Sequence, residues 1–150
     1  MDGLDDAAWT RPRADGKWCP GEVVEHLLLS YDALLRELGG GEGMRLRASW
    51  WRRLVIRVRY LPMVLDGGRL PEGAPAVREI RPAAPARTRD AGTRALRERA
   101  LRFDSEIALA FERGSPRLTH PFFGRLRAPQ ALRFVAVHLE HHRKQIAPRG

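Results

Sequence analysis

The chain has 150 residues, and its 27 Lys and Arg against 18 Asp and Glu give a formal net charge of +9 with histidine neutral. A hydrophobic content of 43% beside 30% charged residues is normal for a globular protein and excludes a disordered or collagen-like chain. No apolar run reaches the roughly 18 to 20 residues that cross a bilayer. The acidic N-terminus does not fit a secretory signal, so we do not expect export, and there is a single cysteine, Cys19. These features predict one domain over residues 1–150 in a reducing cytoplasm.

The first regular element that we expect is a helix from about residue 20 to residue 38. Pro20 and Glu22 suit its first turn, because proline lacks an N–H group and a carboxylate favours the positive end of a helix. Apolar residues recur every three or four positions from Val24 onward, and three glycines, 39–41, end the pattern. Residues 1–16 show no such pattern and are predicted to be irregular.

A basic and aromatic segment follows at residues 44–61, and we interpret it as a second helix, although its residues 54–60 also alternate as a strand would. Two roles fit this composition. Its apolar stripe packs inward while the arginines stay solvated, which is the interpretation that we take. Alternatively, residues 45–60 bind an anionic partner, either nucleic acid or a membrane surface. The stripe consists of Trp50, Leu54, Val58 and Leu61, and the arginines are Arg45, Arg47, Arg52, Arg53, Arg57 and Arg59.

Residues 62–87 hold five prolines and three glycines, which predict a long surface loop. Such a loop either covers a site or only connects two elements, and we interpret it as a connector. A third helix then begins at a cap formed by Asp90 or Thr93 and ends before Gly114. A compact aromatic turn at residues 119–124 and a last helix over about residues 129–146 complete the chain.

The histidines are few but clustered, with three of the five in residues 138–142. His138 and His142 lie four residues apart and project side by side from a helix, as zinc-binding histidine pairs do, and His138 with His141 is a second possible pair. These side chains are either core histidines satisfied by hydrogen bonds or metal ligands. A third imidazole from His26 would leave open positions on the ion, which is typical of catalytic sites. Cys19 is expected to be a small buried thiol.

Two regions of the chain, one near residue 20 and one after residue 119, resemble motifs of a known family. Residues 18–27, WCPGEVVEHL, resemble the W-S-x-x-E-[IV]-[LV]-x-H-L signature of the DinB-like (DinB/YfiT) superfamily. Residues 120–124, HPFFG, and 138–146, HLEHHRKQI, resemble its H-P-x-F-G turn and its closing H-x-x-H-H-x-x-Q-[IL] helix. The resemblance covers about residues 5–147.

The resemblance implies an all-α, up-down four-helix bundle with a long crossover loop. It also implies a three-histidine site for one divalent metal ion, most often zinc or nickel, and the matching positions are His26, His138 and His142. Relatives include metal-dependent hydrolases and enzymes that transfer low-molecular-weight thiols, such as bacillithiol or mycothiol, to electrophiles. We therefore expect a hydrolase or thiol S-transferase that acts on a small molecule through a metal-activated water or thiol.

No general base is identified from the sequence, so the catalytic residues are unknown. Glu25 and Glu140 are expected to face solvent, and Gln145 to orient a ligand. The alternative function is a non-enzymatic helical module that binds an anionic partner through residues 45–60.

The chain departs from the family pattern at two places. The family has a long helix before the first motif, whereas here only residues 1–16 precede it, so we expect the first bundle helix to be missing or truncated. The open side of the bundle would then be filled by residues 50–61 or by a second chain in a homodimer. Cys19 stands where the motif has Ser or Thr, which affects the helix cap more than the chemistry.

Overall fold

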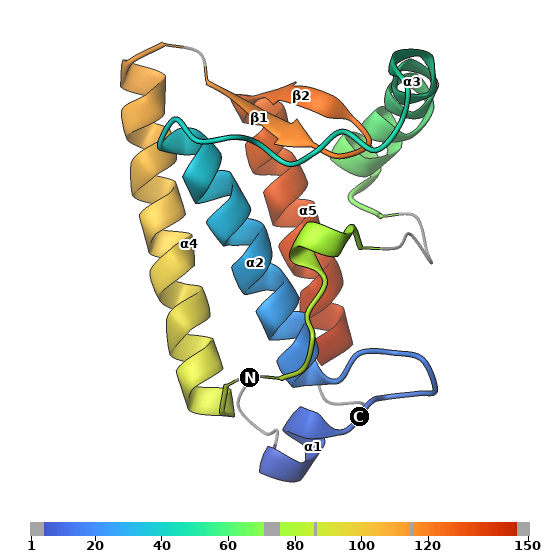
Figure 1. Cartoon of the computed structure of the whole chain (residues 1–150), viewed down its shortest axis with the longest axis vertical. Helices are drawn as coiled ribbons and strands as arrows, with labels where there is room; N and C mark the ends of the chain where they lie inside the picture. Colours follow the sequence, from blue (N-terminus) through green and yellow to red (C-terminus); the bar gives the residue numbers. More distant parts are fainter. Residues whose placement is uncertain (1–4, 71–75, 86, 115, 147–150) are drawn as a thin grey trace.

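The computed structural model describes residues 5–70, 76–85, 87–114 and 116–146. Three long helices run side by side, with α3 and a β-hairpin near one end and α1 near the other (Figure 1). The fold is all-α apart from this hairpin, as the sequence predicts. The elements in chain order are α1 (Asp6–Thr10), α2 (Pro20–Leu38), α3 (Trp50–Gly67), the 3-10 helix η1 (Arg78–Ile80), α4 (Arg89–Glu112), β1 (Arg117–His120), β2 (Gly124–Arg127) and α5 (Ala128–Ile146).

Helix α2 begins at a capping box, where each of two residues satisfies the other's backbone amide. The Cys19 Sγ accepts a hydrogen bond from the Glu22 amide at 3.5 Å, and the Glu22 carboxylate accepts one from the Cys19 amide at 2.8 Å. The sulfur thus replaces the hydroxyl of a Ser or Thr cap. Cys19 is buried, as expected, and burial raises the pKa of its thiol, so it is no ready nucleophile.

The main core lies among α2, α3, α4, α5 and the hairpin. Tyr31 of α2 meets Phe103 of α4 edge to face, with 5.6 Å between the ring centroids, and such pairs add to the stabilisation that burial gives. Burial also raises the pKa of Tyr31 to about 12. The buried residues of this core are Tyr31, Leu35, Leu61, Val64, Phe103, Ile107, Leu118, Phe123, Leu126, Ala128, Ala131 and Val137.

The predicted aromatic turn is the connection of an antiparallel hairpin in which Leu118 pairs with Leu126. Both leucines face the core, which fixes the register of strands too short to be predicted from their alternation. The Glu37 carboxylate accepts hydrogen bonds from the Thr119 amide at 2.8 Å and from the Thr119 hydroxyl at 2.6 Å. These bonds join the hairpin to the end of α2.

The expectation that residues 1–16 are irregular is wrong for Asp6–Thr10, which form the short helix α1. The Asp5 carboxylate caps it by accepting a hydrogen bond from the Ala8 amide at 2.6 Å. Its Trp9 is buried, and the indole N–H donates to the Arg87 carbonyl at 2.9 Å. A five-residue helix is too short to show periodicity, and it is held by this one tertiary anchor.

Helix α3 begins at Trp50, later than the predicted start at residue 44, and continues through Pro62 to Gly67. The expectation that the loop starts at residue 62 is therefore wrong. Proline removes one backbone hydrogen bond, but Leu61 and Val64 are buried on either side of it, and this burial offsets the loss. The remainder of the 62–87 segment includes η1, while residues 71–75 and 86 lie outside the described part.

The expected inward stripe on α3 is also wrong for three of its four members. Leu61 is buried, but Trp50, Leu54 and Val58 are 72%, 53% and 69% exposed. Burial differs along the helix, because Leu61 lies in the C-terminal part of α3, which packs in the core, whereas the other three lie nearer its N-terminus. Next to this region, the Arg57 guanidinium faces the body of the protein. It donates hydrogen bonds to the Phe123 carbonyl at 2.9 Å and to the Arg125 carbonyl at 3.0 Å.

Helix α4 begins one residue after Thr88, whose hydroxyl accepts a hydrogen bond from the Ala91 amide at 3.4 Å. The predicted caps, Asp90 and Thr93, lie inside the helix instead. Asp90 occupies the first turn, and the Thr93 hydroxyl donates back to the Arg89 carbonyl at 2.8 Å. Among the described residues, no helix combines the length and the apolar character that a membrane span requires.

Candidate metal centre

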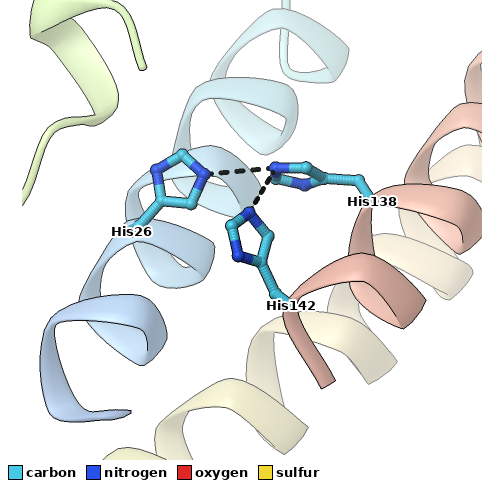
Figure 2. A group of neighbouring side chains, drawn as sticks. All are labelled: His26, His138 and His142. Atoms are coloured by element: carbon cyan, nitrogen blue, oxygen red, sulfur yellow. Dashed lines mark hydrogen bonds between the residues drawn. The ribbon is translucent and has the colours of Figure 1, made fainter. Parts of the chain in front are cut away.

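The structure brings together three histidines that are up to 116 positions apart in the sequence. His26 projects from α2, and His138 and His142 project from successive turns of α5, so that all three rings point toward one another (Figure 2). The His138 Nε2 lies 3.1 Å from the Nε2 of His26 and 3.1 Å from the Nε2 of His142. Among the described residues, these three form a group that is able to hold a metal ion.

The outer nitrogens of two of these rings are already engaged. The His26 Nδ1 lies 2.6 Å from the Ile80 carbonyl oxygen of η1, and the His142 Nδ1 lies 2.7 Å from the Gln145 Oε1. Because an amide or carbonyl oxygen accepts but never donates, each Nδ1 carries the proton. Each Nε2 then directs its lone pair toward the cluster, as in metal sites whose ligands are oriented by neighbouring groups.

The arrangement of protons in the cluster fits a cation better than it fits a set of hydrogen bonds. The Nε2 atoms of His26 and His142 are both acceptors, and a neutral His138 can supply at most one proton between them. At least one lone pair at the centre is therefore left without a donor. The two separations of 3.1 Å that involve His138 approach the value of about 3.3 Å expected for imidazoles bound tetrahedrally to zinc at roughly 2.0–2.1 Å, and all three nitrogens lie within 4.8 Å of one another.

Burial keeps these imidazoles neutral, which is the form that binds metal. Desolvation lowers the pKa of His26 despite its hydrogen bond to the Ile80 carbonyl. Desolvation, followed by repulsion from the other two histidines, holds the pKa of His138 well below its ordinary value. Desolvation, with repulsion from His26, also lowers the pKa of His142 to about 4.

The remaining histidine of the closing motif, His141, lies beside the cluster and outside it. His141 accepts a hydrogen bond at its Nε2 from the Gln145 side-chain amide at 2.9 Å, while the same side chain accepts from His142. Gln145 thus orients one ring of the cluster and is itself held by His141. This is the orienting role expected for Gln145 from the sequence.

A cavity of about 1290 Å³ adjoins the cluster and is lined by residues of α2, α3, α5, η1, the hairpin and the segment before α2. Its apolar wall includes Leu34, Ile56, Phe122 and Phe134. The charged residues that line it within the described chain are all basic: Arg13, Lys17, Arg81, Arg143 and Lys144. A cavity with an apolar wall and cationic groups suits a small molecule that carries both an apolar part and a negative charge.

The 62–87 segment contributes to this site rather than only connecting two helices. Val77 and Ile80 line the cavity, and the Ile80 carbonyl orients His26. Sequence reasoning missed this role, because a backbone carbonyl leaves no signature in the side chains. The connector interpretation is therefore wrong for the described part of the segment.

His120, from the aromatic turn motif, also lines the cavity, and sequence reasoning assigned it no role. Its Nδ1 accepts hydrogen bonds from the Phe122 amide at 3.2 Å and the Phe123 amide at 3.1 Å. Burial lowers its pKa to about 3, so the ring is neutral and its Nε2 carries the proton. His120 therefore offers one N–H donor in the wall of the cavity.

The two glutamates near the ligands along the chain do not line the cavity. Glu140 pairs with Arg143 at 2.7 Å on the outer side of α5. Glu25 was expected to face solvent, but it is buried and forms an ion pair with Arg87. That pairing follows from the position of the segment before α4, which the sequence does not reveal.

Comparison with known proteins identifies a family but no individual relative. No curated protein and no solved structure matches the sequence. A family model described as the DinB superfamily matches residues 1–146, nearly the whole chain. The helical fold and the three-histidine cluster agree with that match, and the protein belongs to the DinB superfamily.

Proposed function

We propose that this protein is a metal-dependent enzyme in which His26, His138 and His142 hold one divalent ion, zinc or nickel. The observation that carries the proposal is the convergence of three Nε2 atoms, together with the outer hydrogen bonds that orient the rings of His26 and His142. Membership of the DinB superfamily supports it. Imidazole nitrogens suit both metals, and the donor set includes no thiolate or carboxylate that would favour another ion.

The bound ion would lower the pKa of a water or of a low-molecular-weight thiol, so that the reaction is a hydrolysis or an S-transfer. The chain's own residues would then select and position the substrate. Lys17 and Arg81 would attract its anionic group, and the apolar wall would exclude water from its remaining surface. The His120 N–H would donate a hydrogen bond to a substrate oxygen.

The proposal is tested by the metal content of the untagged protein, measured by mass spectrometry after incubation with zinc or nickel. We expect about one ion per chain in the wild type and almost none in His142→Ala, because two imidazoles hold an ion far less tightly than three. In Gln145→Leu, we expect metal affinity to fall about 10- to 100-fold, because His142 loses the group that orients it.

His141→Ala is the matched control, since it removes a neighbouring imidazole that lies outside the cluster and leaves Gln145 in place to orient His142. It should retain the ion. The proposed site would be wrong if the wild type bound no ion, or if His141→Ala and His142→Ala lost it equally. With the site established, hydrolysis and thiol transfer are then assayed with anionic and neutral substrates, and His142→Ala protein incubated with the same metal is the blank.

A further inference from the structure

We propose that the outer face of α3 docks on the surface of an anionic lipid bilayer. This face is defined by Trp50, Trp51, Leu54, Val55 and Val58, all of which are more than half exposed. The proposal concerns an interaction surface and is independent of the reaction at the three-histidine cluster.

The outer face forms one continuous apolar strip. Trp50, Leu54 and Val58 recur every four residues, and Trp51 and Val55 form the neighbouring row, so all five side chains lie on one side of the helix. Scattered exposed apolar residues are common, but a contiguous strip with two tryptophans marks a surface that binds something.

The orientation of this strip is held by the rest of the protein. Leu61 and Val64, in the C-terminal part of α3, are buried in the core, and Arg57 binds carbonyl groups of the hairpin segment. Turning the strip inward would expose these buried side chains and break these hydrogen bonds. The outer face is therefore presented to solvent by the fold itself and is not a consequence of a loosely attached helix.

The charge around the strip selects an anionic occupant. Residues 43–65 contain six arginines and no acidic residue. Arg57 is engaged with the body of the protein, and Arg47 pairs with Glu79 at 2.6 Å. Arg52 and Arg59 lie instead against the aromatic rings of Trp51 and Tyr60, at 5.1 Å and 5.9 Å from the ring centroids.

A bilayer matches this combination better than a second copy of the chain. Two copies joined through this strip would bring two sets of arginines together, and like charges oppose such a contact. An anionic membrane would instead attract the arginines while the apolar side chains enter the interfacial region, where tryptophan is favoured. An amphipathic helix lying in the plane of the interface is the geometry that this requires.

The test is co-sedimentation of the full-length protein with vesicles of neutral phospholipid that contain about a quarter anionic phospholipid. We expect the wild type to sediment with these vesicles, to bind purely neutral vesicles much less, and to be released as salt rises. Tryptophan fluorescence should shift to shorter wavelength on binding, because Trp50 and Trp51 leave water.

Two double variants separate the apolar and the charged contributions. Leu54→Ser with Val58→Ser should weaken vesicle binding by more than about tenfold, since two apolar side chains no longer enter the interface. Arg52→Gln with Arg59→Gln should weaken binding to anionic vesicles by about tenfold or more and leave the weak binding to neutral vesicles unchanged. The control is Leu101→Ser with Leu109→Ser, because these leucines are exposed on α4. It should bind as the wild type does.

Several outcomes would overturn the proposal. The first is a wild type that stays in the supernatant with anionic vesicles at low salt. The second is equal loss of binding in the α3 and α4 leucine variants. A dimer in light scattering that Leu54→Ser with Val58→Ser converts to a monomer would assign the face to a second copy. Tighter binding to an oligonucleotide than to anionic vesicles, lost in Arg52→Gln with Arg59→Gln, would assign it to nucleic acid.

Discussion

At the scale of single residues, the site depends on histidines that are kept neutral by burial. His26 and His142 are buried by packing, and their hydrogen bonds to Ile80 and Gln145 set the ring orientation. His120 is governed by the same physics, since two backbone amides occupy its Nδ1. A buried neutral histidine makes folding depend on pH, because the unfolded chain takes up a proton that the folded chain does not.

The pH dependence of the free energy of unfolding that is due to His120 is large enough to measure. Its pKa rises from about 3 in the folded protein to an ordinary 6.5 on unfolding, so the free energy of unfolding falls as the pH drops through this range. Between pH 7 and about pH 5, the protonation of His120 in the unfolded chain should lower the free energy of unfolding by about 2 kcal/mol. In metal-free protein, the free energy of unfolding of His120→Asn should therefore fall by about 2 kcal/mol less than that of the wild type over this interval.

The measurement is urea unfolding of metal-free protein at both pH values. Asparagine keeps an oxygen that can accept from the Phe122 and Phe123 amides, so the substitution removes the titrating group and retains an acceptor. Leu101→Ser changes an exposed side chain without altering any titratable group, and it should show the full loss of stability. An equal loss in His120→Asn and the wild type would contradict the assignment of a depressed pKa to His120.

At the scale of elements, short segments depend on tertiary anchors that long helices do not need. Helix α1 is held by Trp9, which packs so closely on α2 and α4 that two glycines are required beside it. A Cβ at Gly21 would lie 2.9 Å from the Trp9 Nε1, and one at Gly92 would lie 3.1 Å from the Trp9 Cζ2. The buried residues of this second core are Trp9, Val23, Val24, Leu28 and Ile146.

Removing this anchor should destabilise the protein strongly. We expect Trp9→Ala to lower the free energy of unfolding by about 3 to 5 kcal/mol, since it leaves a large cavity and an unpaired carbonyl at Arg87. Trp50→Ala removes the same side chain from a site that is 72% exposed, and should change the value by less than about 0.5 kcal/mol. Urea unfolding of both variants makes the comparison. If Trp9→Ala lowered the free energy of unfolding as little as Trp50→Ala, the proposed anchoring of α1 by Trp9 would be wrong.

At the scale of the whole molecule, charge is distributed unevenly around the cavity. Basic residues are the only charged ones that line it within the described chain, although the protein as a whole has 18 acidic residues. The field inside a water-poor cavity is stronger than on an open surface. The cavity should therefore prefer an anion with an apolar body over its neutral analogue.

A fluorescent naphthalene sulfonate tests this preference. In the Leu54→Ser, Val58→Ser background, which prevents binding to α3, the probe should bind in the cavity and respond to salt. Adding Lys17→Gln with Arg81→Gln should weaken binding about tenfold. Arg94→Gln with Arg102→Gln makes the same change in net charge on the exposed side of α4 and should have little effect. If both pairs weakened binding equally, the net charge alone would account for the preference.

The sequence by itself determined the features that depend on neighbouring residues. Helical periodicity predicted α2, α4 and α5 closely, because a helix and its apolar stripe are set by residues three and four positions apart. The spacing of His138 and His142 and the two family motifs predicted the candidate metal ligands, and the structure places them with His26 in one cluster. Short strands, the anchor of α1 and the cap at Thr88 were missed, because their stability comes from other parts of the chain.

Only the tertiary structure decided how the faces of these elements are used. The periodicity of α3 predicts that Trp50, Leu54 and Val58 pack inward with Leu61. The tertiary contacts of Arg57, Leu61 and Val64 instead hold the C-terminal part of the helix on the core and leave both tryptophans exposed. Likewise, the carbonyl that orients His26 lies 54 residues along the chain in η1. Such contacts join distant segments through the backbone or through one polar group. A local pattern cannot specify them, because their free energy exists only once the chain has folded.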